Sequence, residues 1–381
     1  MKIGIIAAAI HRHGGMERAA AEVFERVAVH HKVMAFSTDC ELTAPNVTHI
    51  PIKAISRPAI LRHESFRRQV RALETETACT ITNSIGAAAI DADVITAQFC
   101  HAAFTDRSGG LRGGTNLLRR RYQNWAQQVY TDQERHAYTS ARLKRVIAVS
   151  CGVKRELMQY YGLADAKIVV IPNAVDHRVF HPAANAEVKL ELRRQLGLPE
   201  SHFLALFVGG DWDRKGLRSA IEAIAGLPDT TLVVVGQGDI KRFTHTAALA
   251  GVSRNVIFTG RSPCPQDYYA ASDAFIFPSQ YEAFSLVTLE AAASGLPLIA
   301  LPINGTEELI EDGVNGFFAR PASASFRSLL GLLQADRPRC RAMSEAAVRS
   351  SRPYTWDRVA SEQMHVFEDA DERLRHERRM T

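Results

Sequence analysis

Long apolar runs are lacking in this 381-residue chain. No stretch approaches the ~18–20 apolar residues that a membrane-spanning helix requires, so a transmembrane anchor is not expected. Residues 3–10 superficially resemble a signal peptide, but they lead into a His-Arg-His segment and a glycine pair without a cleavage site. We therefore expect these residues to form a buried first strand and its loop.

Cysteine pairs are lacking too, because the six cysteines are scattered without a CxxC motif or the spacing of metal ligands. This pattern excludes a disulfide framework and indicates reduced thiols in a cytoplasmic protein. The chain shows no internal repeat and no low-complexity segment, and its 46% hydrophobic and 23% charged residues are typical of a globular protein.

The net charge of +5 is unevenly distributed. Residues 1–185 contain 24 Lys and Arg against 16 Asp and Glu, a net charge of +8, whereas the remainder contains 22 against 25, a net charge of −3. A basic first half suggests that an anionic surface or acceptor binds there. The alternative is that arginines merely solvate the helices of that half.

Short β-branched runs alternate with segments of helical period, which predicts an α/β fold with parallel sheets. Residues 16–27 form the clearest helix, with one apolar stripe. In the first half we expect strands at residues 2–6, 33–36, 80–81, 94–97, 145–148 and 168–171. In the second half we expect them at residues 204–208, 231–235, 256–259, 274–277, 298–300 and 316–319.

The length and a break between the two strand series indicate two domains, because the chain is too long for one compact core. Pro172-Asn173-Ala174 interrupts the chain, and residues 180–185 have the composition of a linker. We expect the two domains at residues 1–183 and 184–353, with a ligand cleft between them at the carboxyl ends of the strands.

The strongest functional signal lies at residues 281–297 (YEAFSLVTLEAAASGLP). A buried strand ends just before this segment, a loop carries Glu282, and a helix begins near Ser285 and ends at Gly295. The free N–H groups and the dipole at the start of this helix suit a diphosphate. The candidate donor-binding residues at this start are Ala283, Phe284, Ser285 and Leu286.

Two glutamates of this segment are candidate ligands of a nucleotide sugar. Glu290 lies about five residues into the helix, or roughly 7–8 Å along its axis, which is near the distance from a diphosphate to its ribose. Its carboxylate can accept hydrogen bonds from both ribose hydroxyls. Glu282 precedes the helix, where the hydroxyls of a donor sugar would lie. Alone, these glutamates would be ordinary surface charges; their strand–loop–helix context favours a binding site.

A second signal is the loop at residues 209–216 (GGDWDRKG), between a strand and a helix. The cations Arg214 and Lys215 can neutralise the charge that develops on a leaving phosphate as a glycosidic bond breaks. The alternative is a solvated, charged turn.

With these motifs the chain resembles the retaining glycosyltransferases of family 4, which have the GT-B fold of two Rossmann-like domains. Their hallmark E-x7-E is matched by Glu282 and Glu290. The resemblance covers most of the chain through smaller motifs at residues 14–15, 149–150, 171–176, 208–216, 235–238 and 354–356. It implies an acceptor-binding domain at 1–183, a nucleotide-sugar-binding domain at 184–353, and a helix at 354–381 that crosses back to the first domain.

The resemblance also implies roles for single residues. Family members use the loop at Gly14 and Gly15 beside the donor phosphates and the acceptor, and they place a sugar-contacting histidine at the position of His101. They hold the nucleobase at the strand ends that carry Gly236 and Arg261, largely through backbone contacts. The alternatives are that the glycines only form a turn and that His101 is structural.

One position departs from the family pattern. Family members commonly have arginine directly after the Val-Gly of the 209–216 loop, whereas this chain has Gly210, which stays a candidate donor-binding residue. In this loop the chain is similar to the bacterial lipopolysaccharide-core glucosyltransferases. The departure leaves the role of Lys215 better defined than that of Arg214.

Three D-x-D triplets invite a metal-binding interpretation, because metal-dependent glycosyltransferases hold Mg²⁺ or Mn²⁺ on the diphosphate with such a motif. They lie at residues 91–93, 211–213 and 369–371. None has the context of a metal site, and the cations and the helix start already supply positive charge. We therefore predict no essential metal and no other cofactor.

The resemblance implies a hexosyltransferase that moves a sugar from a nucleotide diphosphate sugar to a hydroxyl of a cell-surface glycan, glycolipid or similar acceptor, as in lipopolysaccharide biosynthesis. A UDP-sugar such as UDP-glucose is the expected donor, but the residues themselves leave the donor sugar, its base and the acceptor open. The resemblance implies retention at the anomeric carbon, no protein nucleophile, and no nucleic-acid partner. Three alternatives stay open: a GT-B-type epimerase, a non-catalytic nucleotide-sugar-binding protein, and a nicotinamide dehydrogenase. The last is disfavoured because the first loop lacks a G-x-G-x-x-G turn.

Two basic amphipathic segments predict peripheral attachment to an anionic membrane, at its inner face. In residues 60–73 and 117–125, apolar residues interleave with arginines, three of them at 119–121. Basic amphipathic helices with aromatic residues suit the bilayer interface. The alternative is that the apolar residues face the domain core and the arginines are merely solvated.

Overall fold

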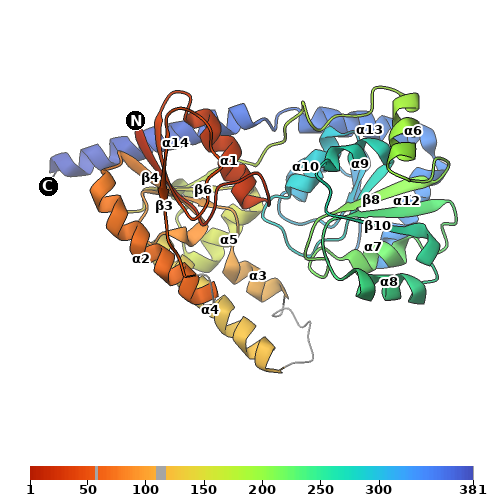
Figure 1. The fold of residues 1–381 in the computed structure, drawn as a ribbon, viewed down its shortest axis with the longest axis horizontal. Helices are drawn as coiled ribbons and strands as arrows, with labels where there is room; N and C mark the ends of the chain where they lie inside the picture. The colour runs from red at the N-terminus through yellow and green to blue at the C-terminus, as the bar shows by residue number, and fades with distance from the viewer. Residues whose placement is uncertain (56–58, 109–116, 381) are drawn as a thin grey trace. The chain divides into compact units, whose positions relative to one another are not determined.

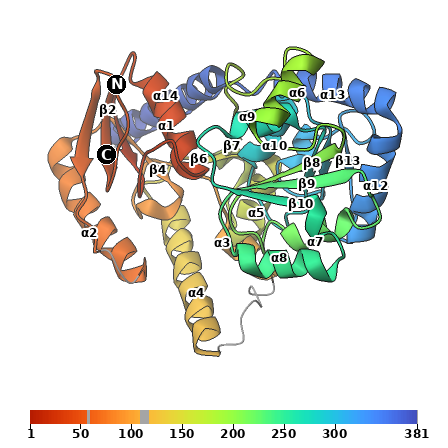
Figure 2. The same ribbon diagram turned by 45° about the vertical axis from the view of Figure 1, so that its right-hand side comes forward.

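The computed structural model describes residues 1–55, 59–108 and 117–380, and the chain divides into two compact units (Figures 1 and 2). The first unit contains Met1–Asn173 and Trp356–Thr381, and the second contains Ala174–Thr355. Residues 174–183, assigned above to the first domain, pack with the second unit. The ring centroid of Phe180, for example, lies 5.5 Å from that of Tyr269.

The first unit is built on a parallel sheet, with the described strands in the order β3-β2-β1-β4-β5-β6-β7. These strands are β1 (Lys2–Ile6), β2 (Lys32–Ser37), β3 (Val47–Pro51), β4 (Ile81–Ile85), β5 (Val94–Ala97), β6 (Arg145–Ala148) and β7 (Ile168–Val170). The helices are α1 (Met16–Val27), α2 (Ala59–Thr77), α3 (His101–Ser108), α4 (Leu117–Thr139), α5 (Cys151–Tyr161) and α14 (Trp356–Met380), with short 3-10 turns η1 (Gly86–Ala88) and η2 (Asp165–Lys167).

Helix α1 carries the apolar stripe expected from its sequence. Val23, Phe24 and Val27 are buried, as the three- and four-residue spacing predicts. Phe24 stacks on Phe367 of α14 with ring centroids 6.2 Å apart. The C-terminal helix therefore packs beside α1 within the first unit, as Figure 1 shows.

The second unit holds another parallel sheet, with the described strands in the order β10-β9-β8-β11-β12-β13. These strands are β8 (Phe203–Val208), β9 (Thr230–Val235), β10 (Val256–Gly260), β11 (Ala274–Phe277), β12 (Leu298–Ala300) and β13 (Gly316–Phe318). The helices are α6 (Ala186–Gln195), α7 (Leu217–Ala223), α8 (Ile240–Leu249), α9 (Pro265–Ala271), α10 (Leu286–Ala293), α11 (Thr306–Leu309), α12 (Ser323–Ala335) and α13 (Arg337–Ser351), with the 3-10 turn η3 (Ser253–Asn255).

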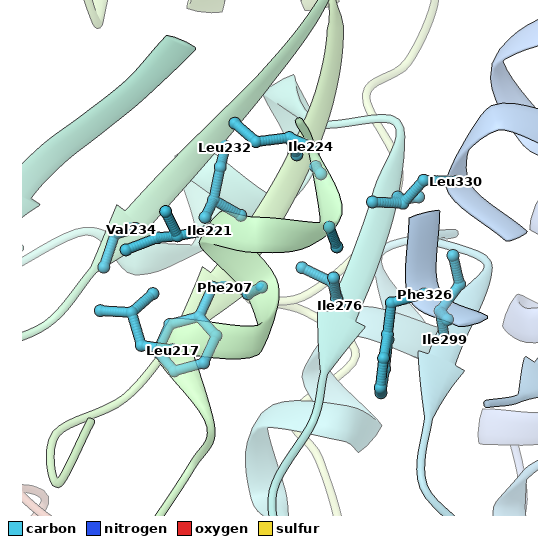
Figure 3. Close-up of a cluster of buried hydrophobic side chains, with 14 of the residues drawn as sticks. Phe207, Leu217, Ile221, Ile224, Leu232, Val234, Ile276, Ile299, Phe326 and Leu330 are labelled. Carbon is cyan, nitrogen blue, oxygen red and sulfur yellow. The ribbon is translucent and has the colours of Figure 1, made fainter. Parts of the chain in front are cut away.

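The apolar core of the second unit lies between its sheet and the helices α7 and α12 (Figure 3). Its labelled members, all at most 1% exposed, are Phe207, Leu217, Ile221, Ile224, Leu232, Val234, Ile276, Ile299, Phe326 and Leu330. Full burial of one such side chain contributes about 1.5–3 kcal/mol. This core holds in place the ends of β8, β9 and β11, from which the loops of the candidate site leave.

In each sheet the strand order reverses once, between β1 and β4 in the first unit and between β8 and β11 in the second. Loops at such a point diverge, and ligands of open α/β sheets bind there, outside the carboxyl ends of the strands. The predicted loops at residues 209–216 and 278–285 follow β8 and β11 directly, so they flank this point in the second unit.

Two strands of the first unit differ from the prediction. The sequence does not predict β3, an edge strand that is largely exposed and ends in proline, so its apolar signal is weak. Strand β4 runs to residue 85, although only residues 80–81 are predicted, because Asn83 and Ser84 interrupt the apolar pattern. Asn83 is nevertheless fully buried, and its Oδ1 accepts a hydrogen bond from Thr96 at 3.1 Å.

Candidate functional site

Three charged side chains meet where β8 and β11 end in the second unit. Oε1 of Glu282 lies 2.8 Å from Nη1 of Arg214 and 3.0 Å from Nζ of Lys215. The hydroxyl of Ser279 donates to the same oxygen at 2.9 Å. The side chains of Arg214, Lys215 and Glu282 are only 19%, 12% and 13% exposed. Arg214, Lys215 and Glu282, all predicted as site residues, thus form one cluster that is largely shielded from water.

The charges of this cluster support one another. Burial alone would raise the pKa of Glu282, but Lys215 and Arg214 outweigh burial and hold this pKa below its ordinary value. Burial also opposes the charge of Arg214, but Glu282 and Asp211 raise its pKa. At neutral pH the site therefore contains an ionised carboxylate between two cations.

The loop that carries both cations is anchored on two sides. Trp212 is 3% exposed and donates from Nε1 to the carbonyl oxygen of Gly209 at 2.8 Å. Its ring packs edge-on against Phe243 of α8, with centroids 5.4 Å apart. On the other side, Asp213 accepts two hydrogen bonds of 2.7 Å from Arg242. These contacts fix the position of the loop and hence of Arg214 and Lys215.

The loops after β8, β9 and β11 approach one another backbone to backbone. Gly236 has φ +136°, and a Cβ built on it would lie 2.2 Å from the carbonyl oxygen of Gly209. Gly216 has φ +74°, and a Cβ there would lie 2.3 Å from the carbonyl oxygen of Pro278. Only glycine fits such positions. Gly210 differs, because it is exposed and a Cβ there would meet its nearest atom at an ordinary 3.6 Å.

Ser285 is the N-cap residue of α10, and its side chain makes no capping hydrogen bond. Ser285 is 4% exposed, and its hydroxyl has no hydrogen-bond partner among the described residues. The N–H groups of the first helical turn have no acceptor within the helix. A buried hydroxyl beside such N–H groups suits phosphate oxygens. Ala283, Phe284 and Leu286, the other predicted phosphate-binding residues, are also buried around this helix start.

Further along α10, Glu290 is 4% exposed, and its Oε2 accepts a hydrogen bond from the hydroxyl of Tyr269 at 2.8 Å. Glu290 therefore lies in the interior of the second unit, on the helix whose N-terminus borders the charged cluster. Arg261, which follows β10, is exposed, and Gly236 is half-buried at the end of β9.

His101 is the first residue of helix α3 in the first unit, and residues 98–100 separate it from β5. Its Nδ1 lies 2.7 Å from Oε1 of Glu134, and its backbone N–H donates to Oε2 at 2.9 Å. The hydroxyl of Tyr161 also donates to Glu134, which is 2% exposed. These contacts orient the imidazole so that Nε2 faces away from Glu134. Gly14 and Gly15 are exposed residues at the start of α1.

Family models match both parts of the chain. Residues 13–179 match the model described as "Glycosyltransferase Family 4", and residues 188–349 match "Glycosyl transferases group 1". The fold is similar to the crystal structure of WaaG, a glycosyltransferase involved in lipopolysaccharide biosynthesis. The TM-score is 0.80 at 20% identity, over 96% of this chain and 99% of that one. The chain belongs to the GT-B glycosyltransferases. The predicted fold class is confirmed.

Other GT-B structures have the same fold. Sucrose-phosphate synthase from Thermosynechococcus elongatus has a TM-score of 0.79 at 18% identity, over 97% of this chain and 98% of that one. HepE of Anabaena, in complex with UDP and glucose, has a TM-score of 0.76 at 18% identity, over 97% of this chain and 100% of that one.

Curated relatives match over shorter stretches. An uncharacterized glycosyltransferase of Methanocaldococcus jannaschii is 27% identical over 73% of this chain and 70% of the relative. The D-inositol 3-phosphate glycosyltransferase of Xylanimonas cellulosilytica is 31% identical over 57% of this chain and 55% of the relative. The match thus spans about half the length of that relative.

The D-x-D triplets of this glycosyltransferase are engaged with arginines. The pairs are Asp93 with Arg142, Asp211 with Arg214, Asp213 with Arg242, Asp369 with Arg145, and Asp371 with Arg375. Within the described parts of the chain, no three His, Cys, Asp or Glu side chains gather as a group that could hold a metal ion.

The two basic segments differ in how much of them is exposed. In α2, Phe66 and Val70 are buried in the domain, and so is Arg67, which is 7% exposed. Phe66 and Val70 therefore face the domain, whereas Leu61, at the start of the segment, is 52% exposed. In α4, Trp125 is 54% exposed, whereas the side chains of residues 117–120 and 122 lie outside the described ones. No helix in the described residues is both long and apolar enough to cross a bilayer.

Sequence reasoning missed several residues that contact the predicted site residues within each unit. Ser279, Tyr269 and Glu134 each make a hydrogen bond to a predicted site residue. A local signal exists for Ser279, because it belongs to a Pro-Ser pair directly after the apolar strand β11. Tyr269 and Glu134 lie 21 and 33 residues from their partners, so no local pattern identifies them.

Proposed function

We propose that this protein transfers a sugar from a nucleotide diphosphate sugar to an acceptor hydroxyl, with retention of the anomeric configuration. The observation that carries the proposal is the cluster of Arg214, Lys215 and Glu282 at the switch point of the second sheet, near the N-terminus of α10. Cations and a helix start together suit a diphosphate. Membership of the GT-B glycosyltransferases agrees with this chemistry.

Each part of the donor has a candidate ligand in the second unit. The diphosphate would accept hydrogen bonds from the first turn of α10 and from the buried hydroxyl of Ser285. The ribose hydroxyls would donate to Glu290, on the same helix. Glu282, which precedes the helix, would accept from hydroxyls of the sugar, and Gly236 and Arg261 would border the base.

In the reaction, the bond between the anomeric carbon and the β-phosphate oxygen breaks, and a bond from that carbon to the acceptor oxygen forms on the same face. The acceptor proton passes to the departing phosphate, so no protein nucleophile is required. Arg214 and Lys215 stabilise the negative charge that grows on this phosphate. His101, held by Glu134 in the first unit, would contact the sugar through Nε2.

A UDP-sugar is the first donor to test, because HepE, which has the same fold, was solved with UDP and glucose. In a thermal-shift screen with UDP-, GDP- and ADP-sugars, one donor should raise the melting temperature, because a ligand that binds the folded state stabilises it. With an acceptor, that donor should also release its nucleoside diphosphate. A flat response to all three classes would contradict the proposal.

We further propose that the transfer requires no divalent metal, because the two cations and the helix start supply the positive charge that a metal would otherwise provide. Activity with the preferred donor should be the same in EDTA as in Mg²⁺ or Mn²⁺. Loss of activity in EDTA that either metal restores would overturn this part of the proposal.

For the acceptor, we propose an anionic glycan or glycolipid that the basic first unit meets at a membrane surface, by way of α4. Trp125 and Arg121, both exposed, are the described side chains that support this placement. Each Lys or Arg near an anionic surface adds about 1 kcal/mol. Binding to anionic vesicles should fall with salt and on neutralising residues 119–121. Equal binding to neutral and anionic vesicles, or none to either, would favour an acceptor in solution.

A further inference from the structure

Tyr269 of helix α9 packs among aromatic residues, and this packing does not explain why the residue carries a hydroxyl. Tyr269 is fully buried, and its ring lies 5.5 Å from that of Phe180 and 6.1 Å from that of Phe275. Phenylalanine would fill this apolar site equally well. A buried hydroxyl is unfavourable unless it is hydrogen-bonded, so its partner indicates its purpose.

That partner is the glutamate to which the donor ribose is assigned. The Tyr269 hydroxyl donates to Oε2 of Glu290 at 2.8 Å and lies 3.4 Å from the carbonyl oxygen of Val287. Because Phe180 and Phe275 enclose the ring, the hydroxyl is held in one place. Because this hydroxyl is fixed, its hydrogen bond restricts the rotation of the Glu290 carboxylate about the side-chain torsions.

We propose that Tyr269 is a positioning residue for the donor nucleoside: it orients Glu290 so that the carboxylate meets the ribose hydroxyls. The inference rests on the proposed function, because Glu290 is the assigned ribose ligand. Tyr269 itself would not touch the donor. Its effect should therefore appear in nucleoside affinity and in discrimination between ribose and deoxyribose, and it should vanish when Glu290 cannot act.

The test is calorimetric titration of the full chain with UDP and with its 2′- and 3′-deoxy analogues. If the wild type binds GDP or ADP instead, that nucleotide and its deoxy analogues are used. Tyr269→Phe should weaken binding of the ribonucleotide about three- to tenfold, the scale of one hydrogen bond. Binding of the analogue that lacks the recognised hydroxyl should change less. With saturating donor, kcat should stay within about twofold of the wild type while KM for the donor rises.

Two controls separate positioning from general damage. Tyr268→Phe changes the neighbouring, half-buried tyrosine of the same helix and should leave UDP affinity unchanged. The double variant Tyr269→Phe with Glu290→Ala should bind UDP no more weakly than Glu290→Ala alone, because Tyr269 acts through the Glu290 carboxylate.

The inference is overturned if Tyr269→Phe binds UDP like the wild type, if it weakens the ribo and deoxy compounds equally, or if the two substitutions weaken binding additively. These outcomes leave the proposed function intact as long as the wild type binds a nucleoside diphosphate. A wild type that binds none of the three nucleotides would overturn the proposed function as well.

Discussion

Removal of the Lys215 ammonium is the perturbation whose effect the structure defines best. Nζ lies 3.0 Å from Oε1 of Glu282 and 4.8 Å from the ring centre of Phe277, and the side chain is 12% exposed. At such distances two unit charges interact with about 4 kcal/mol in the effective dielectric of a shielded protein site. A growing phosphate charge in this place would therefore depend strongly on Lys215.

We expect Lys215→Ala to lower kcat by about 10²–10³, the usual effect of removing one electrostatic stabiliser of a developing oxyanion. The protein should still fold, because Arg214 continues to pair with Glu282 at 2.8 Å. The donor KM should change less than kcat. The leaving β-phosphate oxygen becomes negatively charged only as its bond to the anomeric carbon breaks, so Lys215 stabilises the transition state more than the bound donor.

The assay is release of the nucleoside diphosphate at saturating donor and acceptor, with the variant's melting temperature as a check on folding. Lys241→Ala is the matched control, because Lys241 is an exposed lysine on α8 and its loss should leave kcat unchanged. A kcat for Lys215→Ala within about threefold of the wild type, in a folded variant, would refute the assigned role.

Further predictions concern three carboxylates. Glu290→Ala should raise the donor KM about tenfold or more, since a hydrogen bond to a charged group contributes about 1.5–3 kcal/mol; unchanged steady-state kinetics would contradict the ribose assignment. Glu282→Ala should lower kcat by more than it raises the donor KM, and the reverse order would assign Glu282 to binding alone. Asp273→Asn removes the charge that pairs with Lys189 at 2.8 Å and with Arg193 at 2.7 Å. Because Arg193 is 6% exposed but Lys189 is 29% exposed, the free energy of unfolding in urea titrations should fall by at most about 3–5 kcal/mol. In the wild type, burial opposes ionisation of Asp273, but these two cations hold its pKa below the ordinary value. Its stabilising effect should therefore be present above about pH 4 and be lost as the pH falls through the folded-state pKa, which acid titrations of stability can check.

Continuous apolar strands made the second sheet predictable from the sequence. All six residues of β8 are buried, as are those of β9, because helices cover both faces of a parallel sheet. In the first sheet, β3 lies at an edge and β4 contains buried polar residues, so neither has the apolar run on which prediction depends.

The candidate site was predictable where its residues share a local motif, and not where distant segments meet. The loop, the helix start and the glycine at the helix end are all visible in the sequence. They predict that Glu282 precedes the helix and that Glu290 lies within it. Glu282 contacts Arg214 and Lys215, which lie 68 and 67 residues before it in the sequence. Only the fold reveals these contacts. The same limit holds for Tyr269 and for Glu134.

Amphipathic periodicity has a further limit, which α2 illustrates. The pattern of residues 60–73 shows which side of the helix is apolar. It does not show whether that side packs against a domain or inserts into a membrane. In the structure Phe66 and Val70 pack inward, and Arg67 is buried with them. Burial lowers the pKa of the Arg67 guanidinium to about 10.

The central claim, transfer of a sugar with its configuration retained, is tested most directly by the anomeric configuration of the first-formed product. The protein is incubated with the donor selected by the thermal-shift screen and an acceptor, and the anomeric proton of the new glycoside is followed by NMR from the start of the reaction. We predict that an α-linked donor gives an α-linked product, at a rate that falls with Lys215→Ala. A β-linked product, or donor turnover that forms no glycoside with any acceptor offered, would contradict the claim.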